Sequence, residues 1–512
     1  MHTSADVRAH VRPETRPRLA GGVAGAEEVL ELVETATRAL ADGAVDRSGP
    51  APAGGPAAVA AMLAAQGVDL LPDNGIGAEA ALRELTRLLA AGSVDPSHPW
   101  CAAHLHGPPL AVAAVADLVA AVLNPSMDSW DQAPMGSELE RELTAEFARL
   151  CFPAAPSPDA VVTSGGTESN VLGLLLARQT AADQGFSVVR TVCGANAHHS
   201  VARAAWLLGL PSPIVVPCHG GRMRPDALAE VLADLYDPAI VVATAGTTDA
   251  GVIDPLPRIA ELCRSANAFL HVDAAYGGGV LCSARLRPLL DGLELADTVS
   301  VDLHKFGWQP IAAGLLAVRD TKSLTALDVR AEYLNAADDT EAGLPDLLGR
   351  SLRTSRRADV FKIAVTLRAL GRSGLAGLVE RCCATAAELA GAVAAHPGLR
   401  LWGRPDLSTV LVRPLLADEL AGELGAEAGD ILVARVRRRL LEDGVAVLGR
   451  ASAGPSTSDG DDGASRLWLK LTLLHPTAEL RDYLPLLDIV AARAHQELES
   501  VVADLDRALV VR

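Results

Sequence analysis

The pattern of hydrophobic and polar positions changes twice along the chain. Up to about residue 97, the apolar residues favour helices, with helix-like runs at 26–41, 57–65 and 78–91. From 98 to about 370, short apolar runs alternate with helix-like runs. This alternation is typical of a mainly parallel sheet covered by helices on both faces.

The C-terminal part has a different pattern, because its strand-like runs are not followed by regular crossover helices. The predicted strands lie near 408–413, 445–449 and 467–473. The stretch 451–465 is rich in Gly, Ser and Asp, so we expect it to be disordered. The sequence therefore predicts an α/β protein in three parts: a helical N-terminal segment (1–97), a large domain (98–370) and a smaller α+β domain (371–512).

Composition limits the partners and the compartment. The net charge of −18 argues against nucleic acid and against an anionic membrane as partners. The longest apolar candidate for a membrane span, 110–123, contains Asp117 and is too short. The first residues do not resemble an export signal, and the eight scattered cysteines are typical of reduced thiols. We therefore expect a cytoplasmic protein.

One lysine stands where chemistry could use it. Lys305 follows an apolar strand-like run instead of lying on a polar helix face. In apolar surroundings a lysine loses hydration, its pKa falls, and the neutral amine can condense with an aldehyde. Alone, Lys305 is equally well explained as an ordinary residue beyond a strand end.

Three other segments bear on this choice. The glycine turn at 164–167 follows a predicted strand (158–163) and opens a predicted helix, a place where backbone N–H groups can hold a phosphate. Asp273 ends an apolar strand and faces either a ligand or the next turn. His198 stands at a helix start, as a capping residue or as a flat ring for a ligand. A phosphate cradle, an acid, a flat imidazole and a reactive lysine together are what pyridoxal phosphate requires.

Several motifs then resemble the group II pyridoxal-phosphate-dependent amino-acid decarboxylases, in that family's order and at about its spacing. The resemblance covers about residues 95–490, and segments near 98–100, 124–140 and 332–335 resemble its L-2,4-diaminobutyrate or lysine branch. The motifs are Thr163-Ser-Gly-Gly-Thr-Glu-Ser-Asn170, Ala197-His-His-Ser200, Thr244-Ala-Gly-Thr-Thr248, His271-Val-Asp-Ala-Ala-Tyr276 and Ser300-Val-Asp-Leu-His-Lys305.

The resemblance implies fold type I, the aspartate aminotransferase-like fold, with pyridoxal 5'-phosphate as cofactor. It implies that Lys305 bonds the cofactor, that Asp273 pairs with its ring nitrogen, and that His198 and Ala275 lie on the two ring faces. Further cofactor contacts are implied for Gly165, Gly166, Thr167, Thr248, Asp302 and His304. Asp302 needs a partner beside a phosphate, and His304 is the candidate.

The implied reaction is loss of CO2 from an L-amino acid to give the amine. Tyr333 is the only tyrosine in the expected mobile loop and is therefore a candidate proton donor. The runs 104–106 and 128–132 are expected to line the substrate side, where aspartates could receive a distal ammonium. This favours a diamino acid: 2,4-diaminobutyrate, ornithine or lysine. No metal is expected, because the pair His104 and His106 has no third ligand at a suitable spacing.

Three alternatives stay open on the sequence. The same site could serve an oxidative aldehyde synthase, or a decarboxylase of an aromatic or acidic amino acid. A degenerate paralogue could keep the fold without the reaction. The resemblance further implies a homodimer in which the N-terminal part wraps the partner chain.

Overall fold

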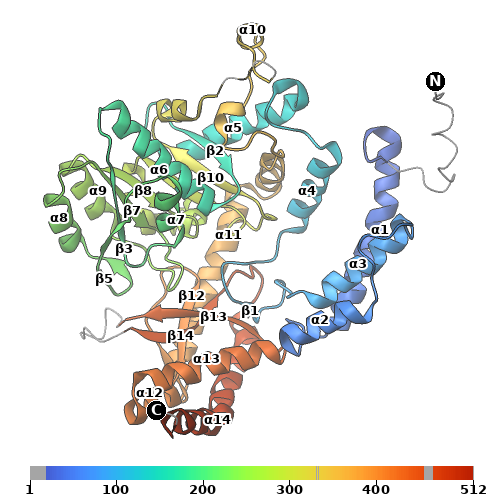
Figure 1. Cartoon of the computed structure of the whole chain (residues 1–512), viewed down its shortest axis with the longest axis vertical. Helices are drawn as coiled ribbons and strands as arrows, with labels where there is room; N and C mark the ends of the chain where they lie inside the picture. Colours follow the sequence, from blue (N-terminus) through green and yellow to red (C-terminus); the bar gives the residue numbers. More distant parts are fainter. Residues whose placement is uncertain (1–18, 330, 332–333, 455–464, 511–512) are drawn as a thin grey trace. The chain divides into compact units, whose positions relative to one another are not determined.

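The computed structural model describes residues 19–329, 331, 334–454 and 465–510 (Figure 1). Its residues form two compact units. The first contains residues 1–95 with 440–447, and the second contains 96–439 with 448–512. The helical segment 1–97 stays a prediction; the N-terminal stretch of the first unit ends at Asp95. The predicted division of the rest near residue 370 stays a prediction; at this point the helix α11 has non-helical φ and ψ angles of 65° and 172° at Gly371.

The first unit is helical in its N-terminal part, as the sequence predicts. Arg47 stabilises the end of α1 because its guanidinium lies 2.7 Å from the Asp95 carboxylate and also donates to the Ala90 carbonyl oxygen. The helices of this part are α1 (Gly22–Arg47), α2 (Gly55–Ala65) and α3 (Ala78–Gly92).

The second unit contains a mainly parallel sheet of seven strands. Only β10 runs antiparallel to its two neighbours, and the other pairings are parallel. The strands, in spatial order, are β2 (Asp159–Thr163), β10 (Gly314–Val318), β9 (Thr298–Asp302), β8 (Phe269–Asp273), β7 (Ala239–Thr244), β3 (Arg190–Gly194) and β4 (Ile214–Val216).

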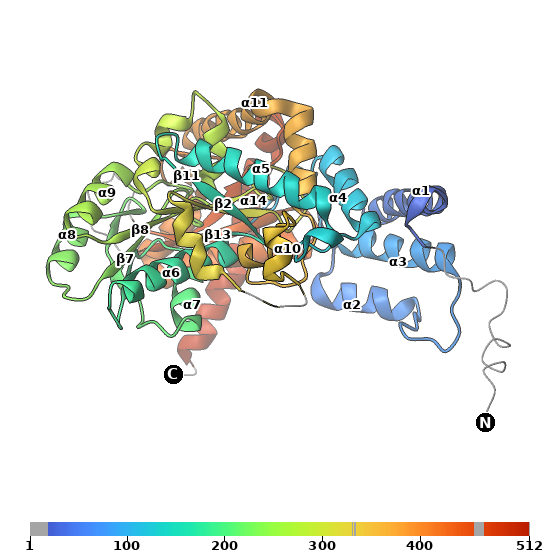
Figure 2. The same ribbon diagram turned by 90° about the horizontal axis from the view of Figure 1, so that it is seen from above.

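Helices cover both faces of this sheet because its strands are apolar on both sides. On β7, Val241 and Ala243 pack with α5, α8 and α9, whereas Ile240 and Val242 pack with α6 and α7. In Figure 2, α6 and α7 lie on one side of the sheet, and α5 and α11 lie on the other. In chain order, the helices between residues 98 and 396 are α4 (Ala111–Leu123), α5 (Pro134–Cys151), α6 (Gly166–Asp183), α7 (Ser200–Leu207), α8 (Pro225–Ala233), α9 (Leu256–Ser265), α10 (Ala337–Glu341) and α11 (Val360–Ala395).

A second sheet combines four strands of the C-terminal part, which pair antiparallel, with one short strand from the start of the second unit. Its strands, in spatial order, are β1 (Cys101–Ala102), β13 (Val447–Ala453), β14 (Arg466–Thr472), β12 (Thr409–Pro414) and β11 (Leu399–Leu401). Its helices are α12 (Leu415–Leu424), α13 (Ala426–Glu442) and α14 (Leu480–Val510). Within the described residues, none of the helices combines the length and apolar character that crossing a membrane requires.

The expected disorder of 451–465 is wrong at its beginning. Ala451 and Ala453 are buried while Ser452 is exposed, which is the alternation of a strand with one face in the core. Ala451 pairs with Trp468 of β14, so the ladder extends three residues into the polar stretch. Residues 455–464 lie outside the described part of the chain.

We predict that the buried ion pair of Glu140 and Arg356 stabilises the second unit. Both side chains are 1% exposed, and Arg356 donates two hydrogen bonds to the carboxylate, at 2.7 and 2.6 Å. Arg356→Met leaves a buried carboxylate without a partner, so we expect the free energy of unfolding in urea to fall by about 3–5 kcal/mol. Arg141→Ala, which removes an exposed pair on the same helix, is the control and should change it by less than about 1 kcal/mol. Equal losses in the two variants would contradict the prediction.

Candidate active site

A pocket of about 630 Å³ lies at the carboxyl ends of three neighbouring parallel strands. The last residues of β7, β8 and β9, which are Thr244, Asp273 and Asp302, all line it. This is the edge at which open α/β sheets bind ligands. The predicted cofactor residues in the described part of the chain all line this pocket: Gly165, Gly166, Thr167, His198, Thr248, Asp273, Ala275, Asp302, His304 and Lys305. Tyr333 lies outside the described residues.

The glycine turn forms one wall and requires its glycines. Gly165 has a φ of +152°, and a Cβ added there would lie 2.9 Å from His304 Cε1. A Cβ on Gly166 would lie 2.8 Å from the Cβ of Ala275. The helix α6 begins at Gly166, and its N-cap residue, Gly165, has no side chain that could cap the helix. The helix N-terminus therefore offers backbone N–H groups to an anion.

Lys305 lies in polar surroundings on one side, contrary to the expectation of an apolar setting. Its Nζ lies 2.9 Å from Oδ2 of the buried Asp302, and His304 Nε2 lies 3.5 Å from the same oxygen. Asp302 therefore has Lys305 as its nearer partner, in addition to the predicted His304. Burial lowers the pKa of His304, although the Asp302 carboxylate opposes this effect.

Asp273 is buried and held by three hydrogen bonds. Its Oδ2 accepts from Asn170 Nδ2 at 2.8 Å, and its Oδ1 accepts from Ala275 N at 3.1 Å and from Ser300 Oγ at 3.2 Å. Burial alone would raise the pKa of this carboxyl group. The Lys305 charge and the hydrogen bond from Asn170 outweigh burial and hold the pKa of Asp273 below its ordinary value.

His198 stands just before α7, which begins at Ser200. Its Nδ1 lies 2.7 Å from Ser200 Oγ and 3.3 Å from Ser200 N, so the ring is fixed by the first turn of the helix. Burial lowers the pKa of His198, although the charge of Asp273 opposes this effect. The imidazole is thus favoured in its neutral, flat form, which suits packing against another ring.

The substrate side differs in part from the prediction. His104, Leu105 and His106 line the pocket as expected, whereas Asp128 and Asp131 do not. Both aspartates lie at the short helix of residues 130–132. Asp128 accepts from Gln132 Nε2 at 3.3 Å, and Asp131 accepts from Ser129 Oγ. Both carboxylates make local hydrogen bonds and do not line the pocket of this chain, where they were expected to receive a distal ammonium.

Lys470 is a pocket residue to which the sequence assigned no role. It lies on β14 and donates from Nζ to the Thr248 carbonyl oxygen at 2.8 Å. Burial lowers its pKa, and the Asp249 carboxylate opposes this effect. Burial and the Lys470 charge also lower the pKa of His104. Sequence spacing could not place Lys470 beside Thr248, which lies in a distant part of the sequence.

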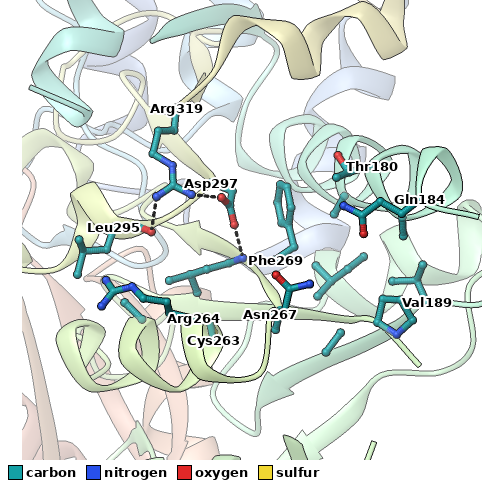
Figure 3. A pocket seen from close by; sticks show the side chains of 18 residues that line it. Thr180, Gln184, Val189, Cys263, Arg264, Asn267, Phe269, Leu295, Asp297 and Arg319 are labelled. Atoms are coloured by element: carbon teal, nitrogen blue, oxygen red, sulfur yellow. Dashed lines mark hydrogen bonds and ion pairs between the residues drawn. The ribbon is translucent and has the colours of Figure 1, made fainter. Parts of the chain in front are cut away.

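A second cavity, of about 300 Å³, lies at the opposite end of β8 (Figure 3). It is lined by the first residues of that strand, whereas Asp273 at the other end lines the larger pocket. Asp297 accepts from Leu270 N at 2.8 Å there and pairs with Arg319, as the dashed lines in Figure 3 mark. None of the predicted site residues lines this cavity.

Comparison with known proteins shows which family the chain is similar to. The pyridoxal-dependent decarboxylase conserved domain matches residues 69–413. The chain belongs to this family. The family is an enzyme family of amino-acid decarboxylases that use pyridoxal phosphate, so the predicted enzyme class and cofactor are confirmed.

Two relatives and one solved structure carry related names. An L-2,4-diaminobutyrate decarboxylase from Rhizobium meliloti is 38% identical, covering 85% of this chain and 85% of its own length. One from Acinetobacter baumannii is 32% identical, covering 84% and 86%. A crystal structure from Vibrio parahaemolyticus superimposes with a TM-score of 0.78 at 30% identity, covering 93% of this chain and 98% of that one. It is titled the glutamate decarboxylase domain of diaminobutyrate-pyruvate transaminase and L-2,4-diaminobutyrate decarboxylase. The predicted type I fold is thereby confirmed.

The pocket fits the cofactor of this family by its own geometry. Two buried oxygens at its wall, Thr244 Oγ1 and Asp302 Oδ1, have no hydrogen-bond partner among the described residues. A Cβ on Gly165 or Gly166 would fill the space beside Asp302 Oδ1. A helix N-terminus, an imidazole and a lysine therefore surround a space large enough for a phosphorylated ring.

We predict that Gly166→Ala weakens cofactor binding, because the added Cβ would lie 2.8 Å from Ala275 Cβ and 3.3 Å from Asp302 Oδ2. Overpacking of this kind corresponds to about a tenfold or larger loss of affinity. The measurement is a titration of the protein with pyridoxal phosphate, followed by absorbance. Gly391→Ala on α11, whose added Cβ meets nothing within 4 Å, is the control and should leave the affinity unchanged. Unaltered affinity in Gly166→Ala would refute the proposed cradle.

Proposed function

We propose that this chain decarboxylates L-2,4-diaminobutyrate, and that the pocket at the carboxyl ends of β7, β8 and β9 is the active site. The substrate proposal is carried by the two relatives of that name, each of which matches more than four fifths of the chain. The placement proposal is supported by the pocket itself, which gathers the predicted cofactor residues from five separate motifs.

The proposed roles follow from position and charge. Lys305 would bond the cofactor aldehyde, Asp273 would pair with the ring nitrogen, and His198 and Ala275 would lie against the two ring faces. The start of α6 and His304 would hold the phosphate. When bound, the cofactor supplies a protonated ring that accepts the electrons left on the α-carbon as CO2 departs. An anionic Asp273 serves this chemistry because it keeps the ring nitrogen protonated.

Lys470 is the proposed partner of the substrate carboxylate. It is a cation in the pocket with a carbonyl oxygen as its hydrogen-bond partner, so the ammonium has donors left for a ligand. The lowered pKa of His104 favours a neutral imidazole, which can accept a hydrogen bond from the distal ammonium of a diamino acid. Tyr333 stays a candidate proton donor.

We also propose a cytoplasmic homodimer. The N-terminal unit supports a partner, because many of its large apolar side chains are exposed; among them are Leu30, Leu40, Leu71 and Leu89. The cysteines, which all lie in described residues, form no disulfide, and this supports a reducing compartment. Gel filtration of the enzyme tests the dimer directly.

We predict that Lys305→Ala abolishes the visible absorbance of the bound cofactor and lowers amine formation about a thousandfold or more, because the amine that bonds the aldehyde is gone. Absorbance spectra and a kinetic assay measure the two effects. Lys322→Ala, at an exposed lysine outside the pocket, is the control. A spectrum unchanged in Lys305→Ala would show that another residue bonds the cofactor.

We predict that L-2,4-diaminobutyrate is the best substrate among L-diaminobutyrate, ornithine, lysine, glutamate, aspartate and tyrosine, with an amine and CO2 as products. Chromatography of the products, with assays for aldehyde, ammonia and peroxide, separates decarboxylation from oxidation. Aldehyde as the main product would refute the decarboxylase, and preference for an acidic or aromatic amino acid would refute the substrate.

We predict that Lys470→Gln raises KM for the substrate about tenfold or more while leaving the affinity for pyridoxal phosphate nearly unchanged, because a charge-assisted hydrogen bond to the carboxylate is lost. The pKa of Lys470 is lowered, so in the wild type KM should begin to rise at a lower pH than an ordinary lysine would allow. Lys470→Arg keeps the charge at all these pH values and should remove this rise. Parallel pH profiles in the wild type and Lys470→Arg would contradict the assignment.

A further inference from the structure

A buried group of polar side chains contacts Asp273. Asn170 of α6 is its centre, because its side chain contacts three partners from two other elements. Its Nδ2 lies 2.8 Å from Asp273 Oδ2 and 2.8 Å from Ser200 Oγ, and its Oδ1 lies 2.9 Å from His271 Nε2. All four side chains are buried.

The direction of each hydrogen bond follows from these contacts. A carboxylate only accepts, so the Asn170 amide must point its Nδ2 at Asp273, which leaves Oδ1 to accept from His271 Nε2. His271 Nδ1 then accepts from Thr298 Oγ1, at 2.8 Å. Burial lowers the pKa of His271 to about 4, which agrees with a neutral ring carrying one proton, on Nε2.

The same amide also reaches His198. Ser200 Oγ accepts from Asn170, so its own proton is available to His198 Nδ1 at 2.7 Å. The backbone N–H of Ser200 points to the same nitrogen, at 3.3 Å. Both contacts favour a His198 ring that carries its proton on Nε2.

The helix α6 is shaped for this group. Gly173 lies one turn after Asn170, and a Cβ there would lie 2.6 Å from His271 Nδ1 and 2.8 Å from His271 Cε1. The absence of a side chain at 173 therefore makes the space in which His271 can reach Asn170. Asn170 and Gly173 lie on one face of α6. Asn170 binds the His271 imidazole, and Gly173 leaves the space that this ring occupies.

We propose that Asn170 is a positioning residue that fixes the orientation and the charge of Asp273 and the tautomer of His198 through one amide, with His271 and Thr298 holding that amide in place. The proposal rests on the proposed roles of Asp273 and His198 toward the cofactor. Asn170 connects Asp273, the proposed partner of the ring nitrogen, with His198, which would lie on a ring face. Both side chains are therefore oriented before the cofactor binds.

A double-mutant cycle on cofactor affinity tests the proposal. The dissociation constant for pyridoxal phosphate is measured by absorbance and by tryptophan fluorescence for the wild type, Asn170→Ala, Asp273→Asn and the double variant. A hydrogen bond to a charged group is stronger than one to a neutral group. We therefore expect Asn170→Ala to weaken binding about 10- to 100-fold in the wild type and about fivefold or less in the Asp273→Asn background.

Two pairs of variants separate positioning from simple loss of stability. Ser169 lies next to Asn170 on α6, and its hydroxyl makes a buried hydrogen bond to Thr163 of β2. Ser169→Ala removes this bond without touching Asp273, so it should lower the melting temperature but not the cofactor affinity. His271→Gln keeps an amide N–H for Asn170 Oδ1 and should stay near wild type, whereas His271→Leu should resemble Asn170→Ala. Circular dichroism confirms that each variant is folded.

The pH dependence of cofactor affinity gives an independent measurement. The titratable groups that face Asp273 are Lys305, His271 and His198. Asn170 lowers the pKa of Asp273, so Asn170→Ala raises it and should move the acidic limb of the affinity profile to higher pH. Equal losses in both backgrounds of the cycle, or an acidic limb that does not move, would overturn the proposal. Because the readout is binding of the cofactor, a failure of the diaminobutyrate assignment would leave this test intact.

Discussion

The proposed active site depends on keeping the carboxylate of Asp273, which is 6% exposed, in its charged form. Burial alone would favour the protonated form of Asp273, and an uncharged acid would be a poor partner for a protonated ring nitrogen. The protein opposes burial with hydrogen bonds from Asn170, Ser300 and the Ala275 N–H, and with the charge of Lys305. These donors come from α6, β9, the turn after β8 and the segment after β9, so the charge of Asp273 requires the whole arrangement.

The parallel sheet makes this arrangement possible. Because β7, β8 and β9 run in the same direction, residues almost thirty positions apart reach one edge together. The antiparallel strand β10 pairs with β9 on the side away from β8. Its first residue, Gly314, must be small. A Cβ on Gly314 would lie 2.6 Å from Gly165 Cα, so this strand packs directly against the turn that forms the cradle. The glycines at 165, 166 and 314 thus bring backbone close to the ligand space.

The sequence predicted the sheet because strands and helices depend on local patterns. The end of β8 at Asp273 is visible from its apolar run alone, and the resemblance of the motifs predicted residues that line the larger pocket. The contacts of Asn170 were not predicted, because helical spacing gives a face of α6 but not which strand residue opposes it. The place of Lys470 in the pocket could not be predicted, because it depends on how the two sheets pack together. Asp128 was misassigned, because a short helix satisfies its carboxylate locally, and sequence spacing does not reveal that competition.

The charge inventory of the pocket constrains how a diamino acid can be recognised. Among the described residues that line it, the carboxylates are Asp273 and Asp302, and both already have cationic or amide partners. Among the described lining residues, the distal ammonium therefore has no carboxylate that is free of a cationic or amide partner. Two kinds of acceptor remain: neutral groups such as His104, and carboxylates of a second copy. The first would bind the ammonium weakly and tolerate several chain lengths. The second would make substrate selectivity a property of the dimer.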